Sequence, residues 1–235
     1  MNWVVSFLKS SIGAKAVVAL TGVALVGFVV QHMLGNLQLF AGAEQFNSYA
    51  HTLKSLGPLL WIARLGLLGL FGLHIGMALR VQKMNRAARG ATPYMGGGRK
   101  SQASTVASRS MLLGGLMLLL FVLFHLSHYT LGFTNAEFLT FVDAQGRHDA
   151  YKMTVLGFSS KITVGFYIGA MGVLAFHLGH GVSSMFQTLG LNHPRYRPMI
   201  KGFGPILGTV VFLGFTSIPI AVQLGIITLQ GGVAS

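Results

Sequence analysis

Four histidines each interrupt a different long apolar stretch of this chain: His32, His74, His125 and His177. An ionisable side chain inside a membrane-spanning helix is costly, so by default it marks a functional site. One such histidine alone would more often be explained by a hydrogen bond to a neighbouring backbone carbonyl. Four of them on four segments require a shared explanation.

The depth of these histidines sorts them into two pairs. Each lies about 15 residues beyond the start of its apolar segment, which at 1.5 Å per residue is roughly 22–24 Å into a hydrocarbon core of about 30 Å. Successive segments cross the membrane in opposite directions. His32 and His125 therefore share one depth, and His74 and His177 share another that lies roughly 15 Å away along the membrane normal.

A pair of histidines at one depth suits a planar macrocycle between two helices, with each imidazole giving one axial nitrogen to a haem iron. Zinc or copper would need three or four ligands that converge on one point. The chain has no cysteine, which excludes thiolate zinc sites, cysteine-ligated iron–sulfur clusters and covalent attachment of haem. The sequence thus predicts two non-covalent haems b. Because both axial positions of each iron are filled, it predicts electron transfer and not oxygen chemistry.

Glycines are frequent in the same segments, Gly22 and Gly115 among them. Small residues let a porphyrin lie close to a backbone, but they also serve ordinary packing between membrane helices. Both interpretations stay open for any one glycine.

Two further histidines, His128 and His180, each follow a predicted ligand by three residues on nearly the same helix face. Either could be the ligand instead, or could contact a haem propionate or a quinone. We keep His125 and His177 as the predicted ligands. His128 lies one turn nearer the surface, where it fits the depth match less well. The histidines in predicted loops or helix ends, which we expect to be solvated, are His51, His148 and His193.

Composition places these segments in a membrane. Of the 235 residues, 52% are hydrophobic and 9% are charged, whereas roughly 25% of a soluble domain is charged. The formal charge is +13, but the basic residues lie between apolar runs, which argues against a nucleic-acid-binding domain. The segments long enough to span a bilayer are 16–40, 59–81, 110–132, 162–189 and 204–229. The predicted fold is all-α, a polytopic bundle of five transmembrane helices in one domain, 1–235.

The distribution of basic residues sets the predicted orientation. Five spans put the termini on opposite sides, and twelve of the 17 Lys and Arg residues fall on the side of the N-terminus. By the positive-inside rule, the N-terminus is cytoplasmic and the C-terminus outside. His32 and His125 are then the outer pair, and His74 and His177 are the inner pair. The first apolar run is too long for a signal peptide and lacks a clear cleavage site, so we expect it to be a membrane span.

Around these histidines the sequence resembles the di-haem cytochrome b membrane anchor (cytochrome b558 family) of bacterial succinate:quinone oxidoreductases, which include succinate dehydrogenases and fumarate reductases. The resemblance covers nearly the whole chain. It rests on VVQHMLGN around His32, GLHIGMALR around His74, FVLFHLSH around His125 and FYIGAMGVLAFHLGHGVSSMFQTLG around His177. The segment AEQFNSYAHTLKSLGP after the first span is the most specific, because composition does not require it.

This resemblance implies that the four histidines are the axial ligands, in the pairs that depth also gives. It further implies a flavoprotein and an iron–sulfur subunit docked on the cytoplasmic face, menaquinone as the quinone, and the bacterial cytoplasmic membrane as the location. The succinate or fumarate chemistry would belong to the partner subunits. The basic inner surface, 80–109 and 193–201, is larger than anchoring requires, which also predicts docking of soluble redox subunits.

Four charged residues are candidates for contacts with quinone or haem. Glu44 is the only acid near the outer ends of the first two spans, and family members use a carboxylate as a proton relay near the outer haem. An exposed loop acid is the alternative. Lys15, Arg80 and Arg109 lie at inner span ends, where they could neutralise propionates or serve as positive-inside anchors.

Two other classes of protein compete with this interpretation. A transporter that uses intramembrane histidines as a proton relay would have broken helices and acids near the midplane. The spans contain no acid, and Pro219 alone interrupts a predicted helix interior. A non-haem metal enzyme would need the histidines to cluster, whereas their depths separate them into pairs.

Overall fold

The computed structural model describes residues 2–88, 106–191 and 193–229, with only the backbone described for 106–109. It is all-α, and five helices are long and apolar enough to span a membrane. These are α2 (Ser11–Leu37), α4 (Pro58–Ala88), α5 (Val106–Tyr129), α7 (Lys161–Thr188) and α8 (Arg197–Gln223). The prediction of a multi-pass membrane bundle of five helices is confirmed.

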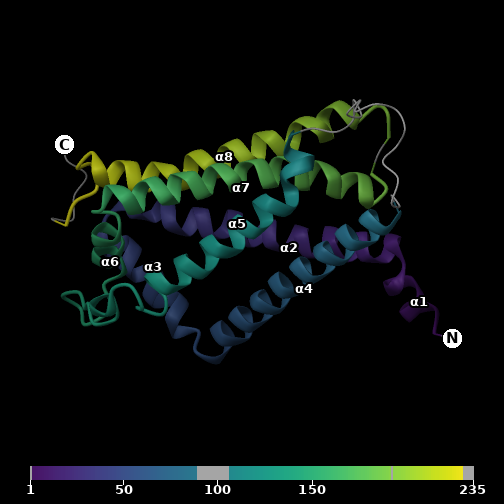
Figure 1. Ribbon diagram of the computed structural model, residues 1–235. Coiled ribbons are helices and arrows are strands. Elements are labelled where there is room, and N and C mark those ends of the chain that lie inside the picture. The colour runs from purple at the N-terminus through teal and green to yellow at the C-terminus, as the bar shows by residue number, and fades with distance from the viewer. Residues whose placement is uncertain (1, 89–105, 192, 230–235) are drawn as a thin grey trace.

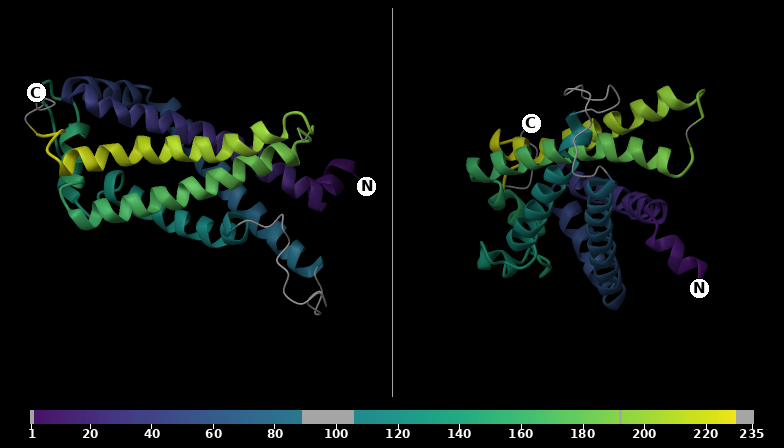
Figure 2. Two further views of the ribbon diagram at one scale, coloured as in Figure 1. Left: turned by 90° about the horizontal axis from the view of Figure 1, so that it is seen from above. Right: turned by 45° about the vertical axis from the view of Figure 1, so that its right-hand side comes forward.

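The five long helices form an elongated bundle with the two chain termini at opposite ends (Figures 1 and 2). The helix α2 packs against α4, α7 and α8, while α7 packs against α5 and α8. Among the described residues, the backbones of α2 and α5 do not pack closely, and neither do those of α4 and α7. No described residue of α4 is buried, so this helix has most of its surface available to lipid.

Caps and prolines define where the long helices begin. The Ser10 side chain caps α2 by accepting a hydrogen bond from the Gly13 N–H, and Ser160 caps α7 in the same way. The last helix begins at Arg197, earlier than the predicted 204, because Pro198 fits the first turn. As a result Pro205 also lies inside a helix, so the prediction that Pro219 alone does so is wrong.

Three short helices were not predicted: α1 (Trp3–Lys9), α3 (Ala43–Ser55) and α6 (Ala150–Gly157). They fall outside the apolar segments that membrane thickness selects. The helices α3 and α6 lie together at the end of the bundle opposite the N-terminus (Figure 1). We call this end the outer end and the opposite one the inner end, after the predicted orientation.

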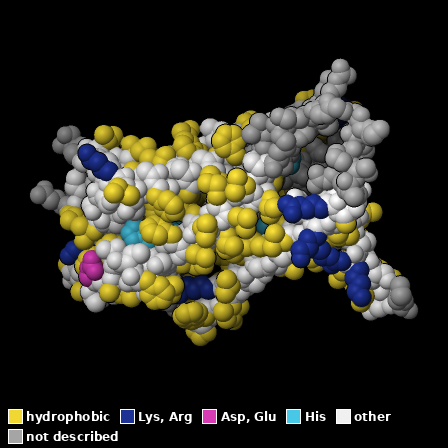
Figure 3. Space-filling model, viewed as in Figure 1, with side chains coloured by type: hydrophobic (Ala, Val, Ile, Leu, Met, Phe, Trp, Pro, Cys, Tyr) yellow, Lys and Arg dark blue, Asp and Glu magenta, His cyan; other side chains and the backbone are white. Residues whose placement is uncertain are grey.

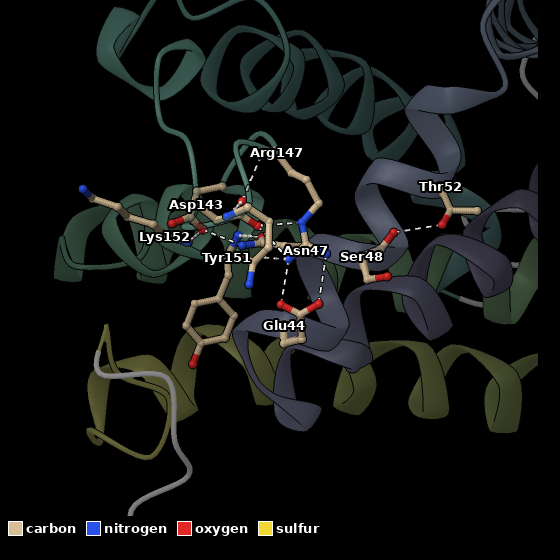
Figure 4. A network of polar contacts seen from close by, with 10 residues as sticks. Glu44, Asn47, Ser48, Thr52, Asp143, Arg147, Tyr151 and Lys152 are labelled. Atoms are coloured by element: carbon tan, nitrogen blue, oxygen red, sulfur yellow. Dashed lines mark hydrogen bonds and ion pairs between the residues drawn. The ribbon is translucent and has the colours of Figure 1, made fainter.

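A buried asparagine joins the short helices α3 and α6 at the outer end (Figure 4). The Asn47 carbonyl accepts a hydrogen bond of 2.9 Å from the Tyr151 N–H, and its amide donates to Asp149 Oδ1 at 2.9 Å. Asp149 also caps α6 by accepting from the Lys152 N–H. Because only 2% of Asn47 is exposed, these bonds are shielded from water.

An arginine ties the connection between α5 and α6 to α3. Arg147 forms two hydrogen bonds with the Glu44 carboxylate, at 3.0 and 2.7 Å, and one with Asp143 at 2.8 Å (Figure 4). Together with Asn47, this arginine fixes α3, the connection and α6 as one polar cap. Below the cap lies the hydrophobic core, which includes Leu39, Phe46, Tyr151, Phe158 and Tyr167.

Charge is distributed unequally between the two ends of the bundle. All four acidic residues lie at the outer end, on α3, on the connection between α5 and α6, or at the cap of α6. Basic side chains gather at the inner end, where the N-terminus lies, while hydrophobic side chains cover much of the middle (Figure 3). One of these basic residues, Arg80, donates to the carbonyls of Leu8 and Lys9 and thereby ends α1.

We predict that Asn47→Ala weakens the outer cap more than Glu44→Gln does. The alanine leaves the buried Tyr151 N–H without its acceptor, which costs about 1–3 kcal/mol. The Glu44 side chain is 69% exposed, so water replaces its bonds to Arg147. The measurement is hydrogen exchange of the α3 and α6 amides in detergent. Equal protection in the two variants would contradict this account of the cap.

Candidate functional site

The outer pair of histidines comes together near the outer ends of α2 and α5. His32 on α2 and His125 on α5 have ring centroids 5.9 Å apart, with ring planes at 82°. Two imidazoles on opposite sides of one metal ion, with metal–nitrogen bonds of about 2 Å, would have centroids roughly 6 Å apart. The observed spacing therefore suits two axial ligands of one metal.

The structure also distinguishes His125 from His128, the alternative ligand on the same helix. The rings that contact His32 in the described structure are Phe28, His125 and Phe215, and His128 is not one of them. His128 is buried instead between Tyr129 and Phe124. The geometry thus favours His125 as the partner of His32.

The inner pair lies on two other helices, His74 on α4 and His177 on α7. His74 and His177 lie near enough for their charges to interact. Two glycines face these rings: a Cβ at Gly22 would lie 3.5 Å from His74 Cε1, and a Cβ at Gly115 would lie 3.7 Å from His177 Cε1. At these two positions glycine leaves a space between the helix backbone and the imidazole. An alanine methyl would just fill that space, and a longer side chain would meet the ring.

Each pair bridges two helices whose backbones do not pack closely. The outer pair lies on α2 and α5, and the inner pair on α4 and α7, and neither combination is among the helix pairs that pack closely in the described structure. A flat group held by two imidazoles needs this kind of separation between its two helices. Among the described residues, no three or more His, Asp or Glu side chains cluster as a site for a bare metal ion.

Hydrogen bonds at the inner pair leave one nitrogen of His74 available. His74 Nδ1 lies 3.0 Å from Thr21 Oγ1, and Thr21 donates its own hydrogen to the Val17 carbonyl at 2.7 Å. With the Thr21 hydrogen donated there, the Thr21 oxygen accepts from His74, and this arrangement places the imidazole hydrogen on Nδ1 and leaves the Nε2 lone pair for a metal. His177 Nδ1 is buried without a hydrogen-bond partner among the described residues.

The outer pair has a comparable set of neighbours. His125 Nδ1 lies 3.3 Å from the Tyr167 hydroxyl, which again leaves Nε2 available. His32 Nε2 lies 3.4 Å from the Asn36 amide nitrogen, which is a long hydrogen bond. The Asn36 amide already donates to the His32 carbonyl at 2.7 Å, so the ring nitrogen is only weakly engaged.

The candidate proton relay Glu44 is an exposed partner of Arg147, which is held also by Asp143. The hydrogen bonds from Arg147 lower the pKa of the Glu44 carboxyl below its ordinary value of 4.5. Glu44 is therefore ionised at neutral pH and contributes to the outer cap. Its part in quinone proton transfer stays a prediction.

Among the described residues, the other candidates at the inner end form no hydrogen bond or ion pair with the four histidines. Lys15 is exposed, and Arg80 binds the end of α1. The side chain of Arg109 lies outside the described residues, as do positions 89–105 of the basic connection. His180 is half-buried on α7. Their contacts with propionate or quinone stay predictions.

The loop histidines only partly follow the prediction. His51 and His193 are exposed, as predicted. His148 is half-buried, because it lies in the connection that folds onto the outer cap, so the prediction that it is solvated is wrong.

Sequence reasoning missed two residues that orient the histidines, Thr21 and Tyr167. Tyr167 lies within the motif around His177, but its hydroxyl serves His125 on another helix. Thr21 lies 53 residues before His74, so no local spacing connects the two. These contacts depend on how each helix is rotated about its axis, which local spacing in the sequence does not give.

Comparison of the chain with models of protein families, with curated proteins and with solved structures finds no match.

Proposed function

We propose that this chain is a di-haem cytochrome b that anchors a succinate dehydrogenase or fumarate reductase in the membrane and exchanges electrons with a quinone. The observation that carries the proposal is the 5.9 Å spacing of the His32 and His125 rings, with a second histidine pair on two other helices. The sequence resemblance to di-haem membrane anchors supplies the reaction and the partners.

The residues of this chain would hold and orient two haems b. His32 and His125 would be the axial ligands of the outer haem, and His74 and His177 those of the inner haem. When bound, haem supplies reversible one-electron chemistry. Thr21 fixes the ring orientation of His74. The glycines at 22 and 115 leave space between the helix backbones and the inner imidazoles. With two histidines holding each iron, no position would be left for oxygen.

The charge distribution supports a cytoplasmic partner at the inner end. Basic residues there have no acidic neighbours, because all four acids lie at the outer end. We propose that this surface docks the iron–sulfur and flavoprotein subunits of a respiratory complex II on the cytoplasmic side of a bacterial inner membrane. Menaquinone would react near the outer haem, with Glu44 as a candidate proton relay. The succinate or fumarate chemistry would reside in the partner subunits.

The structure gives less support to a proton-coupled transporter. No acid lies within the five candidate spans, and each span is one continuous helix, including α8 with its two internal prolines. Transporters of that class have interrupted helices at the substrate site.

We predict that substitutions of the four histidines divide by pair. His32→Ala and His125→Ala should perturb one haem, and His74→Ala and His177→Ala the other, because each haem loses one axial bond. Redox-resolved optical spectra of purified protein measure this. His180→Ala tests the alternative ligand, since His180 lies one helical turn from His177, and it should leave two haems bound. If His32→Ala and His74→Ala affected the same haem, the assignment would be wrong.

We predict that charge reversal at the inner end releases the partner subunits. Lys83→Glu combined with Arg86→Glu on α4 should lower the flavin and non-haem iron that co-purify with the chain, while the haem content is unchanged. Electrostatic docking also predicts weaker association at high salt. The control is Lys152→Glu at the outer end. If no flavoprotein or iron–sulfur protein accompanied the unaltered chain from native membranes, the proposed partners would be wrong.

A further inference from the structure

The hydroxyl of Tyr167 lies between two histidines of the neighbouring helix. Its oxygen is 3.3 Å from His125 Nδ1 and 3.1 Å from His128 Nδ1. Tyr167 and His128 are both buried, so water cannot compete readily for these bonds. His125 is the proposed ligand of the outer haem, whereas His128 has no role in the proposed function.

Aromatic packing fixes the position of this hydroxyl. The Tyr167 ring packs edge-to-face against Phe121, with centroids 5.1 Å apart and planes at 84°. It also packs edge-to-face against Phe158, with ring centroids 5.0 Å apart and ring planes at 90°. A ring held on two sides has little freedom to turn, so the hydroxyl is directed at the two imidazoles by the core itself.

Ligation would give the two hydrogen bonds a definite direction. A neutral imidazole that binds a metal through Nε2 carries its hydrogen on Nδ1, so His125 must donate to the Tyr167 oxygen. Tyr167 has one hydrogen of its own, and His128 Nδ1 is the remaining acceptor. The chain of bonds runs from His125 through Tyr167 to His128, and donation to His128 makes the tyrosine oxygen a better acceptor.

We propose that Tyr167 and His128 are positioning residues that set the orientation and the basicity of His125, and thereby lower the reduction potential of the outer haem. This inference rests on the proposed function, because it needs a haem on His125. It assigns to His128 a role as the terminal acceptor of a hydrogen-bond chain, in place of contact with a propionate or a quinone.

The sign of the effect follows from the direction of the bonds. An acceptor at the far nitrogen of a ligating imidazole makes that imidazole a stronger donor to the metal. A stronger donor stabilises ferric over ferrous iron, which lowers the reduction potential. Loss of the acceptor should shift the ferric-to-ferrous equilibrium roughly tenfold, or about 59 mV upwards for one electron.

The test compares two tyrosines of the same aromatic cluster. Tyr167→Phe removes the bridging hydroxyl and keeps the ring. Tyr129→Phe is the matched control, because Tyr129 packs against both His125 and His128 while its hydroxyl has no hydrogen-bond partner among the described residues. Both variants are purified from membranes in the same way as the unaltered chain. Their haem content is counted, and each haem is titrated at one fixed pH.

We expect Tyr167→Phe to raise the potential of the outer haem by the stated amount and to alter its low-temperature electron paramagnetic resonance signal, which reports ligand orientation. The inner haem and Tyr129→Phe should show neither change. If two haems are present but Tyr167→Phe behaves like Tyr129→Phe, the inference is overturned while the proposed function stands. If the unaltered chain binds no haem, the proposed function fails, and the inference fails with it.

A second pair of variants decides the case in which Tyr167→Phe loses the outer haem. His128→Gln keeps an acceptor for the Tyr167 hydroxyl, whereas His128→Leu removes it. We expect an upward shift of the outer haem in His128→Leu that His128→Gln largely restores. Equal potentials in these two variants would overturn the inference.

Discussion

A histidine inside a hydrocarbon layer favours a partner at each of its two ring nitrogens, and the described structure gives one to some of these nitrogens but not to His177 Nδ1. Water is absent there, so an unpaired imidazole nitrogen costs free energy. Thr21 serves one nitrogen of His74, and Tyr167 serves one nitrogen of His125. The remaining nitrogens of these two histidines are left for another partner. We propose that this partner is a metal, one between His32 and His125 and another between His74 and His177.

Helix packing agrees with this account. Among the close backbone contacts are those of α7 with α8, of α2 with α4 and of α5 with α7, while each histidine pair lies on two helices that do not pack closely. Glycine at positions 22 and 115 leaves space between the inner imidazoles and the facing backbones of α2 and α5. The polar cap formed by Asn47 and Arg147 closes the outer end and holds α3, α6 and the connection between α5 and α6 together.

The spans and the histidine pairs could be predicted from sequence because both depend on regular quantities. Membrane thickness sets the length of an apolar helix, and the constant rise per residue places His32 level with His125. The outer cap could not be predicted in this way. Arg147 meets Glu44 across 103 residues, and α3 is a half-polar helix that no thickness criterion selects. The contacts of Tyr167 and Thr21 depend on how each helix is rotated, and the weakly amphipathic apolar spans do not encode that rotation clearly.

The most direct measurement of the central claim is the haem content of the purified chain, produced in membranes with ample haem and assayed as the pyridine haemochrome. The account predicts two haems b per chain, both with the optical spectrum of low-spin iron bound by two histidines. A chain that is folded and helical in detergent but carries one haem or none would contradict it.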